Sequence, residues 1–166
     1  MESLLLELTV WLRETAVSHF IREVQWVWAL CESLHFVGLA LLLGTAGFFD
    51  LRLMGWFRDV PVAAAKSMMP VAMAGFLLNL ATGMCFLVGA PDQYALNPAW
   101  WLKVASLGLA GLNAAYFETR MAAAALAIPA GGETTTPMKL VGGVSLLSWL
   151  AVLYWGRMLP FIGTAF

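Results

Sequence analysis

Four long apolar stretches dominate this sequence and restrict the folds it can adopt. They run approximately over residues 24–49, 67–88, 98–117 and 138–161. Each is long enough to cross the hydrocarbon core of a bilayer as a helix, which takes about 20 apolar residues. Because lipid offers no hydrogen bonds, a crossing segment must satisfy its own backbone, as a helix does. We therefore predict an all-α, integral membrane four-helix bundle, with residues 24–166 as the transmembrane domain.

The overall composition supports a lipid environment. Hydrophobic residues make up 61% of the chain and charged residues 11%, against about 45–50% and about 25% in soluble domains. A soluble domain of this size leaves too much surface in water to hide so many apolar side chains. The net charge of −1 provides no positive field for nucleic acid. The expected partner is the lipid bilayer.

The N-terminal segment, residues 1–23, has a different pattern. Leu5, Leu8, Leu12 and Phe20 can share one stripe of a helix, with most charged residues elsewhere. The segment is too polar to span a membrane, so we predict an amphipathic helix lying in the membrane interface. The alternative is a soluble helix that packs on a partner.

Basic residues between the spans indicate the orientation. Four spans place both termini on one side of the membrane, together with Arg13, Arg22 and Arg157, and with Lys103 near that side. The opposite side carries five basic residues: Arg52, Arg58, Lys66, Arg120 and Lys139. Cytoplasmic loops carry the excess of Lys and Arg. Both termini are therefore predicted to be periplasmic.

Polar residues inside the spans are the natural candidates for function, because burying them in lipid is costly. Counting 1.5 Å per residue from the span ends brings His35, Asn79, Asn113 and Ser148 near the bilayer midplane. We expect these four side chains to form one polar layer. The alternative is that they make interhelical hydrogen bonds that only fix the rotation of the helices.

Glu32 and Lys103 extend this predicted site. Glu32 precedes His35 by three residues, so both lie on one helix face, and Lys103 enters the third span from the same membrane side. A Glu32–Lys103 pair would compensate the buried carboxylate; a protonated Glu32 or a Glu32–His35 hydrogen bond are alternatives. The candidate cofactor-binding residues are therefore His35, Glu32, Lys103, Asn79 and Asn113.

His35 has several possible roles in such a site: ligating haem, binding a quinone oxygen or passing a proton. The only other histidine, His19, lies in the N-terminal segment, and no methionine is level with His35. Six-coordinate haem b within one chain is therefore disfavoured, while five-coordinate haem or haem shared with a partner chain stays open. A weaker alternative is a Cu(I) site made by His35, Cys31 and Cys85, which are soft or borderline ligands at similar depths.

Several segments together resemble a known group of proteins. Residues 32–38 read Glu-Ser-Leu-His-Phe-Val-Gly, residues 50–55 read Asp-Leu-Arg-Leu-Met-Gly, and residues 111–117 read Gly-Leu-Asn-Ala-Ala-Tyr-Phe. They resemble a family of small, uncharacterised bacterial four-helix integral membrane proteins, distantly similar to CopD-type copper-resistance membrane proteins and b-type cytochrome bundles. The resemblance implies a multi-pass protein of the bacterial inner (plasma) membrane. In the family that the chain resembles, a histidine often stands where this chain has Glu118. If that histidine is a ligand, its replacement argues against haem or metal binding by this chain.

These observations lead to a functional hypothesis with two rivals. The first reading is a redox-associated membrane subunit with a polar intramembrane site around His35 for haem, quinone or a proton. The rivals are a structural or assembly subunit of a larger membrane complex and a small copper-handling or transport protein. No hydrolytic or phosphate-binding motif is present. We therefore do not expect a complete enzyme in this chain alone, but a homo-oligomer or an association with other membrane subunits.

Overall fold

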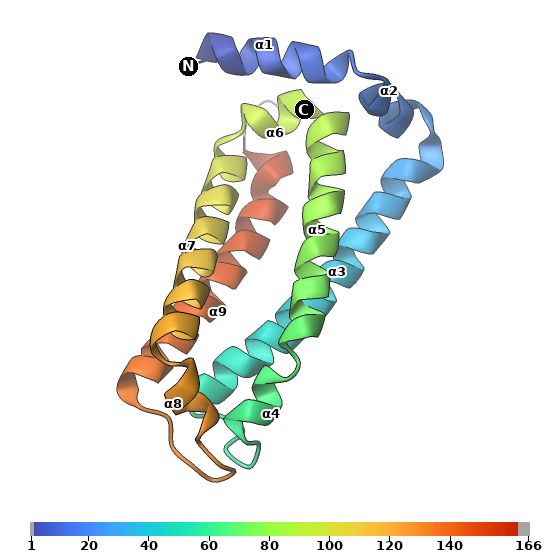
Figure 1. Cartoon of the computed structure of the whole chain (residues 1–166). Helices are drawn as coiled ribbons and strands as arrows, with labels where there is room; N and C mark the ends of the chain where they lie inside the picture. Colours follow the sequence, from blue (N-terminus) through green and yellow to red (C-terminus); the bar gives the residue numbers. More distant parts are fainter. Residues whose placement is uncertain (1, 163–166) are drawn as a thin grey trace.

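The computed structural model describes residues 2–162, which form helices joined by loops and contain no strand (Figure 1). Residue 1 of the predicted N-terminal helix and residues 163–166 of the predicted transmembrane domain lie outside this range. The elements in order are α1 (Glu2–Arg13), α2 (Ala16–Glu23), α3 (Gln25–Leu53), α4 (Val62–Lys66), α5 (Met69–Gly89), α6 (Pro91–Ala95), α7 (Pro98–Arg120), α8 (Ala122–Leu126), α9 (Thr136–Met158) and the 3₁₀ helix η1 (Leu159–Phe161).

Three helical segments are long and apolar enough to cross a membrane. They are Gln25–Leu53, which is α3; Val62–Gly89, which comprises α4 and α5; and Thr136–Phe161, which comprises α9 and η1. They coincide with the first, second and fourth apolar stretches of the sequence. The prediction of an all-α protein suited to a membrane is thus confirmed at this level. The third stretch forms α7, a helix of 23 residues.

The long helices associate as two pairs. α3 packs along α5, α7 packs along α9, and α3 also contacts α9, which joins the pairs (Figure 1). At the α3–α9 crossing a Cβ on Gly142 would lie only 2.7 Å from the carbonyl oxygen of Asp50. Only a residue without a side chain allows the two backbones to approach this closely. The short helices α4 and α8 lie at one end of the molecule, and α1, α2 and α6 at the other.

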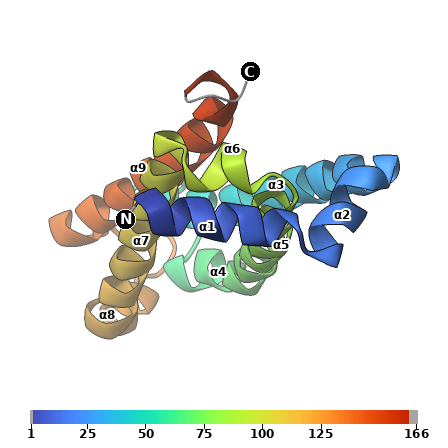
Figure 2. The ribbon, with the colours of Figure 1, turned by 90° about the horizontal axis from the view of Figure 1, so that it is seen from above.

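The N-terminal segment is two helices instead of one. The chain breaks at Thr15, whose hydroxyl donates to the carbonyl of Leu12 at 2.7 Å and accepts from the amide of Ser18 at 3.2 Å. This N-cap starts α2 in a new direction. Viewed from above, α1 runs across the ends of the long helices (Figure 2), where it contacts α6 and α5. α1 therefore packs on the rest of the protein, in addition to any contact that it makes with the membrane interface.

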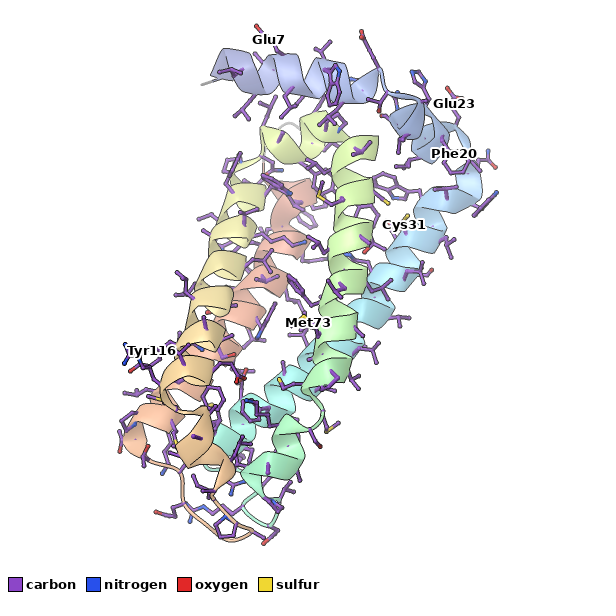
Figure 3. The ribbon with its side chains drawn as sticks, in the orientation of Figure 1. Glu7, Phe20, Glu23, Cys31, Met73 and Tyr116 are labelled. Carbon is purple, nitrogen blue, oxygen red and sulfur yellow. The ribbon has the colours of Figure 1, made fainter. Side chains whose placement is uncertain are left out.

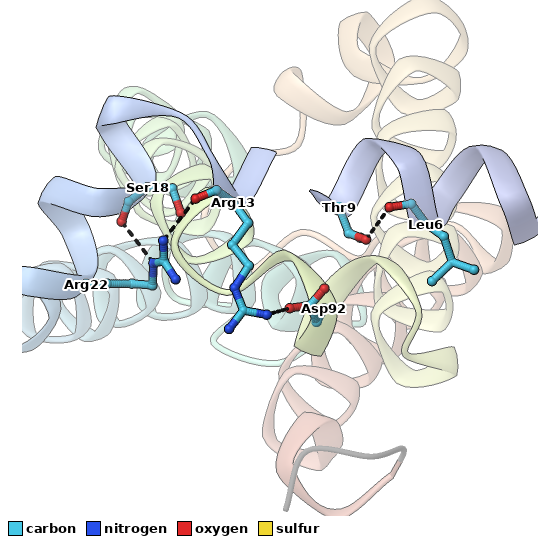
Figure 4. Close-up of polar contacts among 6 residues, drawn as sticks. All are labelled: Leu6, Thr9, Arg13, Ser18, Arg22 and Asp92. Atoms are coloured by element: carbon cyan, nitrogen blue, oxygen red, sulfur yellow. Dashed lines mark hydrogen bonds and ion pairs between the residues drawn. The ribbon is translucent and has the colours of Figure 1, made fainter. Parts of the chain in front are cut away.

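Two arginines fasten these N-terminal helices (Figure 4). Arg13 forms an ion pair of 2.6 Å with Asp92 of α6. Arg22 of α2 donates to the carbonyl oxygen of Arg13 at 2.9 Å and to that of Ser18 at 3.4 Å. Since the Arg13–Asp92 pair is exposed, its contribution is about 0.2–1 kcal/mol. Thr9 of α1 is almost completely buried, with 1% of its surface exposed.

A buried arginine organises the opposite end of the molecule. The side chain of Arg52, at the end of α3, is fully buried. Its Nε donates to the carbonyl of Val60 at 2.6 Å and its Nη2 to the carbonyl of Gly132 at 3.1 Å. Because these acceptors belong to the α3–α4 and α8–α9 loops, Arg52 holds the two loops together. The sequence indicated only a charged residue that ends the first span.

Candidate functional site

The candidate site is built where α3 and α5 approach most closely. A Cβ on Gly75 would lie 2.7 Å from the carbonyl oxygen of Gly38, and one on Gly38 would lie 2.9 Å from the carbonyl oxygen of Gly75. Both distances are too short for any real side chain. Small residues at such crossings let two helix backbones touch and bring polar groups on either helix within reach of each other.

Asn79 of α5 uses this proximity to bind the backbone of α3. In the amide orientation that satisfies both polar atoms, its Nδ2 donates to the carbonyl of His35 at 2.7 Å and its Oδ1 accepts from the amide of Leu39 at 3.0 Å. In a regular helix these two backbone groups bond each other. The Asn79 amide thus bridges one helical hydrogen bond of α3. A Cβ on Gly38 would lie 2.7 Å from this amide, so glycine at position 38 makes the bridge possible.

The imidazole of His35 is held by Thr82, one turn further along α5. Nδ1 of His35 lies 2.7 Å from Oγ1 of Thr82, and the Thr82 hydroxyl donates its proton to the carbonyl of Leu78 at 2.8 Å. Nδ2 of Asn79 also lies 3.3 Å from Nδ1. Side chains of α5 therefore surround Nδ1 and fix the orientation of the ring.

This arrangement leaves Nε2 of His35 open. None of the described residues forms a hydrogen bond with it. The ring is half-buried, and its centroid lies 5.4 Å from that of Phe86 in an edge-on arrangement. Trp28 packs on the same phenyl ring at 5.1 Å. His35 therefore has a fixed orientation, one satisfied nitrogen and one available nitrogen beside aromatic side chains.

Glu32 lies near this site but has a different partner from the one expected. Its carboxylate accepts a hydrogen bond of 3.1 Å from Nε1 of Trp28, one turn earlier on α3, and its side chain is exposed. Burial, and then the Glu32 charge, raise the pKa of the phenol of Tyr94 in α6 to about 12. The phenol therefore stays protonated at neutral pH.

Lys103 does not form the expected ion pair with Glu32 within the part of the chain that the structure describes. Its side chain lies against α9, where a Cβ on Gly156 would be 3.5 Å from its Nζ. The expectation rested on similar depth along two helices. The depth of a residue along a span does not determine how the helix is rotated about its axis. α7 is rotated so that Lys103 faces α9, the helix that pairs with α7.

Asn113 and Ser148 likewise belong to the other helix pair. Nδ2 of Asn113 donates to the carbonyl of Val141 on α9 at 3.0 Å, and the hydroxyl of Ser148 donates to the carbonyl of Val144 within α9 at 2.7 Å. The four midplane residues therefore do not join in one hydrogen-bonded layer. Asn79 contacts His35, whereas Asn113 fastens α7 to α9.

The two cysteines meet across α3 and α5. Cys31 and Cys85 are free thiols of one apolar cluster, and Figure 3 labels Cys31 in the half of α3 that is nearer α2. Among residues 2–162, no three His, Cys, Asp or Glu side chains are grouped so as to hold a metal ion. His35, Cys31 and Cys85, the predicted copper ligands, therefore do not form such a group.

Three residues of this site were missed in the sequence: Thr82, Gly38 and Gly75. A signal for them exists, because Gly75, Asn79 and Thr82 recur at spacings of four and three and so share one face of α5. A stripe of small and polar residues in an apolar helix is typical of a helix–helix contact.

The chain was also compared with known proteins. No family model matches it, and neither does any curated protein or solved structure.

Proposed function

We propose that this protein is a redox-associated membrane subunit in which His35 binds a quinone or a haem b within the membrane. The observation that carries the proposal is the hydrogen bond of 2.7 Å between Nδ1 of His35 and Thr82. It fixes the orientation of a histidine in an apolar span and leaves Nε2 available.

Histidines that bind cofactors commonly have this second interaction. The nitrogen opposite the ligand donates to an oxygen of the protein, which fixes the ring and increases the basicity of the ligating nitrogen. Thr82 fills this role for His35, and the Asn79 bridge holds the backbone of the same residue. Nε2 is suited to accept a hydrogen bond from a quinol hydroxyl or to ligate iron. The residues present fit a single histidine ligand from this chain, so a second axial ligand would come from a partner chain.

Spectroscopy and lipid extraction test this proposal. We expect protein purified in mild detergent to show either a Soret band or one extractable quinone, and we expect His35→Ala to lose it. His19→Ala is the matched control, because His19 is the other histidine and lies exposed on α2, paired with Glu23 at 3.1 Å. A colourless, quinone-free wild-type preparation would refute the proposal.

The membrane arrangement belongs to the same proposal. We infer that α7 is a fourth span of the bundle, since its 23 residues extend about 34 Å at 1.5 Å per residue alongside α9. α1 and α2 would then lie in the interface, with both termini in the periplasm of a bacterial inner membrane. The resemblance to the small four-helix family named above agrees with this arrangement. Reporter fusions after residues 60 and 130 test it: both should be cytoplasmic.

A structural or assembly subunit is a second candidate, favoured by the outer face of α1. Leu4, Val10 and Trp11 are 71%, 56% and 63% exposed there, on a helix that already covers the end of the molecule. Such a patch is typical of a contact surface. Co-purification in mild detergent tests this candidate: a Trp11→Glu variant should lose a partner that the wild type retains. A clean homo-oligomer without a partner would count against it.

A further inference from the structure

Cys31 and Cys85 have no role in the proposed function, and their positions relate them to its site. Cys31 precedes His35 by four residues and Cys85 follows Thr82 by three, so each lies one turn from the His35–Thr82 contact on the same helix face. The contacts between α3 and α5 therefore continue from Gly38–Gly75, through His35–Thr82, to the two cysteines.

The environment of the two thiols is apolar and close to lipid. Cys31 is 9% exposed and packs with Ile21, Val27 and Phe86. Cys85 is half-buried beside the same cluster. The two free thiols belong to the same apolar cluster. Both lie within spanning segments, so an oxidant dissolved in the bilayer reaches them more readily than one dissolved in water.

We propose that Cys31 and Cys85 form a dithiol–disulfide couple that donates electrons to a quinone. In this step both S–H bonds break and one S–S bond forms between Cys31 and Cys85. The two electrons and two protons pass to the two quinone oxygens, which yields a hydroquinone. The proposal rests on the quinone form of the proposed function, because the quinone bound at His35 is the acceptor.

The packing of both cysteines in one cluster makes this step structurally simple. A disulfide requires its two Cβ atoms to come within about 3.5–4.5 Å, and two cysteines of one cluster on closely crossing helices can reach that arrangement. The resulting link would join α3 to α5 above the Gly38–Gly75 crossing, where the helices are already held together. Oxidation therefore needs little movement of the backbone.

An anaerobic titration in nanodiscs tests the proposal. The reduced wild-type protein is mixed with a short-chain ubiquinone analogue, and hydroquinone formation is followed by ultraviolet absorbance. Free thiols are counted by maleimide labelling and mass spectrometry. We expect one equivalent of hydroquinone per chain, loss of both thiols and a peptide cross-linked through Cys31 and Cys85. Unchanged thiols in protein that binds the quinone would overturn the proposal.

Two variants separate the couple from general thiol chemistry. Cys31→Ser should abolish hydroquinone formation while quinone binding persists. The double variant Met84→Cys, Cys85→Ser keeps two thiols per chain but moves one to a position where the native side chain is 51% exposed. It should also be inactive, and hydroquinone formation by it at the wild-type rate would contradict the proposal. Absence of quinone binding to the wild type would instead refute the proposed function, and this inference with it.

Discussion

The two helix pairs are held together in different ways. In the α3–α5 pair the backbones touch at Gly38 and Gly75, and side chains of α5 bind both the backbone and the side chain of His35. In the α7–α9 pair, side chains of α7 bind only backbone carbonyls: Asn113 donates to Val141, and Asn97, the N-cap of α7, donates to Leu159 and Ile162. The interhelical hydrogen bond between two side chains is thus in the α3–α5 pair.

Because of this difference, the contact between the backbones of α3 and α5 holds the His35 site rigid. A histidine in lipid must be oriented to be useful, and a side-chain network orients it only if the helices carrying the network cannot slide. The Gly38–Gly75 crossing prevents sliding one turn away from the histidine. We therefore expect the α3–α5 pair to lose more stability on substitution than the α7–α9 pair.

The largest effect is expected for Gly75→Ala. The new methyl would lie 2.7 Å from the carbonyl of Gly38 and 2.8 Å from the amide of Leu42, and backbone atoms cannot move aside as a flexible side chain can. We expect a loss of about 1–3 kcal/mol, measured by thermal or SDS unfolding in detergent. Gly111→Ala in α7, where no atom lies within 4 Å of the new methyl, is the control. Equal effects of the two substitutions would contradict the comparison.

Thr82→Val is expected to act on ligand binding more than on folding. Valine keeps the shape of threonine but removes the oxygen that accepts from Nδ1 of His35. The loss of such a partner typically lowers affinity by about 10–100-fold. Quinone or haem retention after purification measures the effect, with Thr119→Val, whose hydroxyl bonds only within α7, as the control. If Thr82→Val retained the ligand fully, Thr82 would have no positioning role.

The sequence predicted the helices well because apolar length is a one-dimensional property. Residues 24–49 were recognised as a span from composition alone, and α3 covers all of them except Val24, its N-cap. The site was predicted less well, because depth along a span was used without rotation. Asn79 binds His35, whereas Lys103 turns to α9. The rotation of α5 was encoded in its stripe of small and polar residues.

A smaller difference in the loss of stability is expected between Asn79→Ala and Asn113→Ala. Removing Asn79 breaks two bonds to α3, which is a continuous helix across His35 and Leu39. Removing Asn113 breaks one bond to Val141. Interhelical hydrogen bonds in membranes average about 0.6 kcal/mol, so we expect about 1 kcal/mol for Asn79 and about 0.6 kcal/mol for Asn113. Unfolding in SDS measures both, and a larger loss for Asn113 would reverse the comparison.

The smallest effect is expected for the ion pair between α1 and α6, the short helix that connects the two helix pairs. Arg13→Gln removes an exposed ion pair to Asp92, and α6, which carries Asp92, links α5 to α7. Surface pairs contribute about 0.2–1 kcal/mol and are screened by salt. The variant should therefore loosen α1, seen as faster amide exchange over Glu2–Arg13, at low salt but not at high salt. Glu7→Gln, on the outer face of α1 (Figure 3), is the control and should change nothing. A salt-independent effect of Arg13→Gln would mean that the arginine acts through packing, and α1 would then be an integral part of the α3–α5 half.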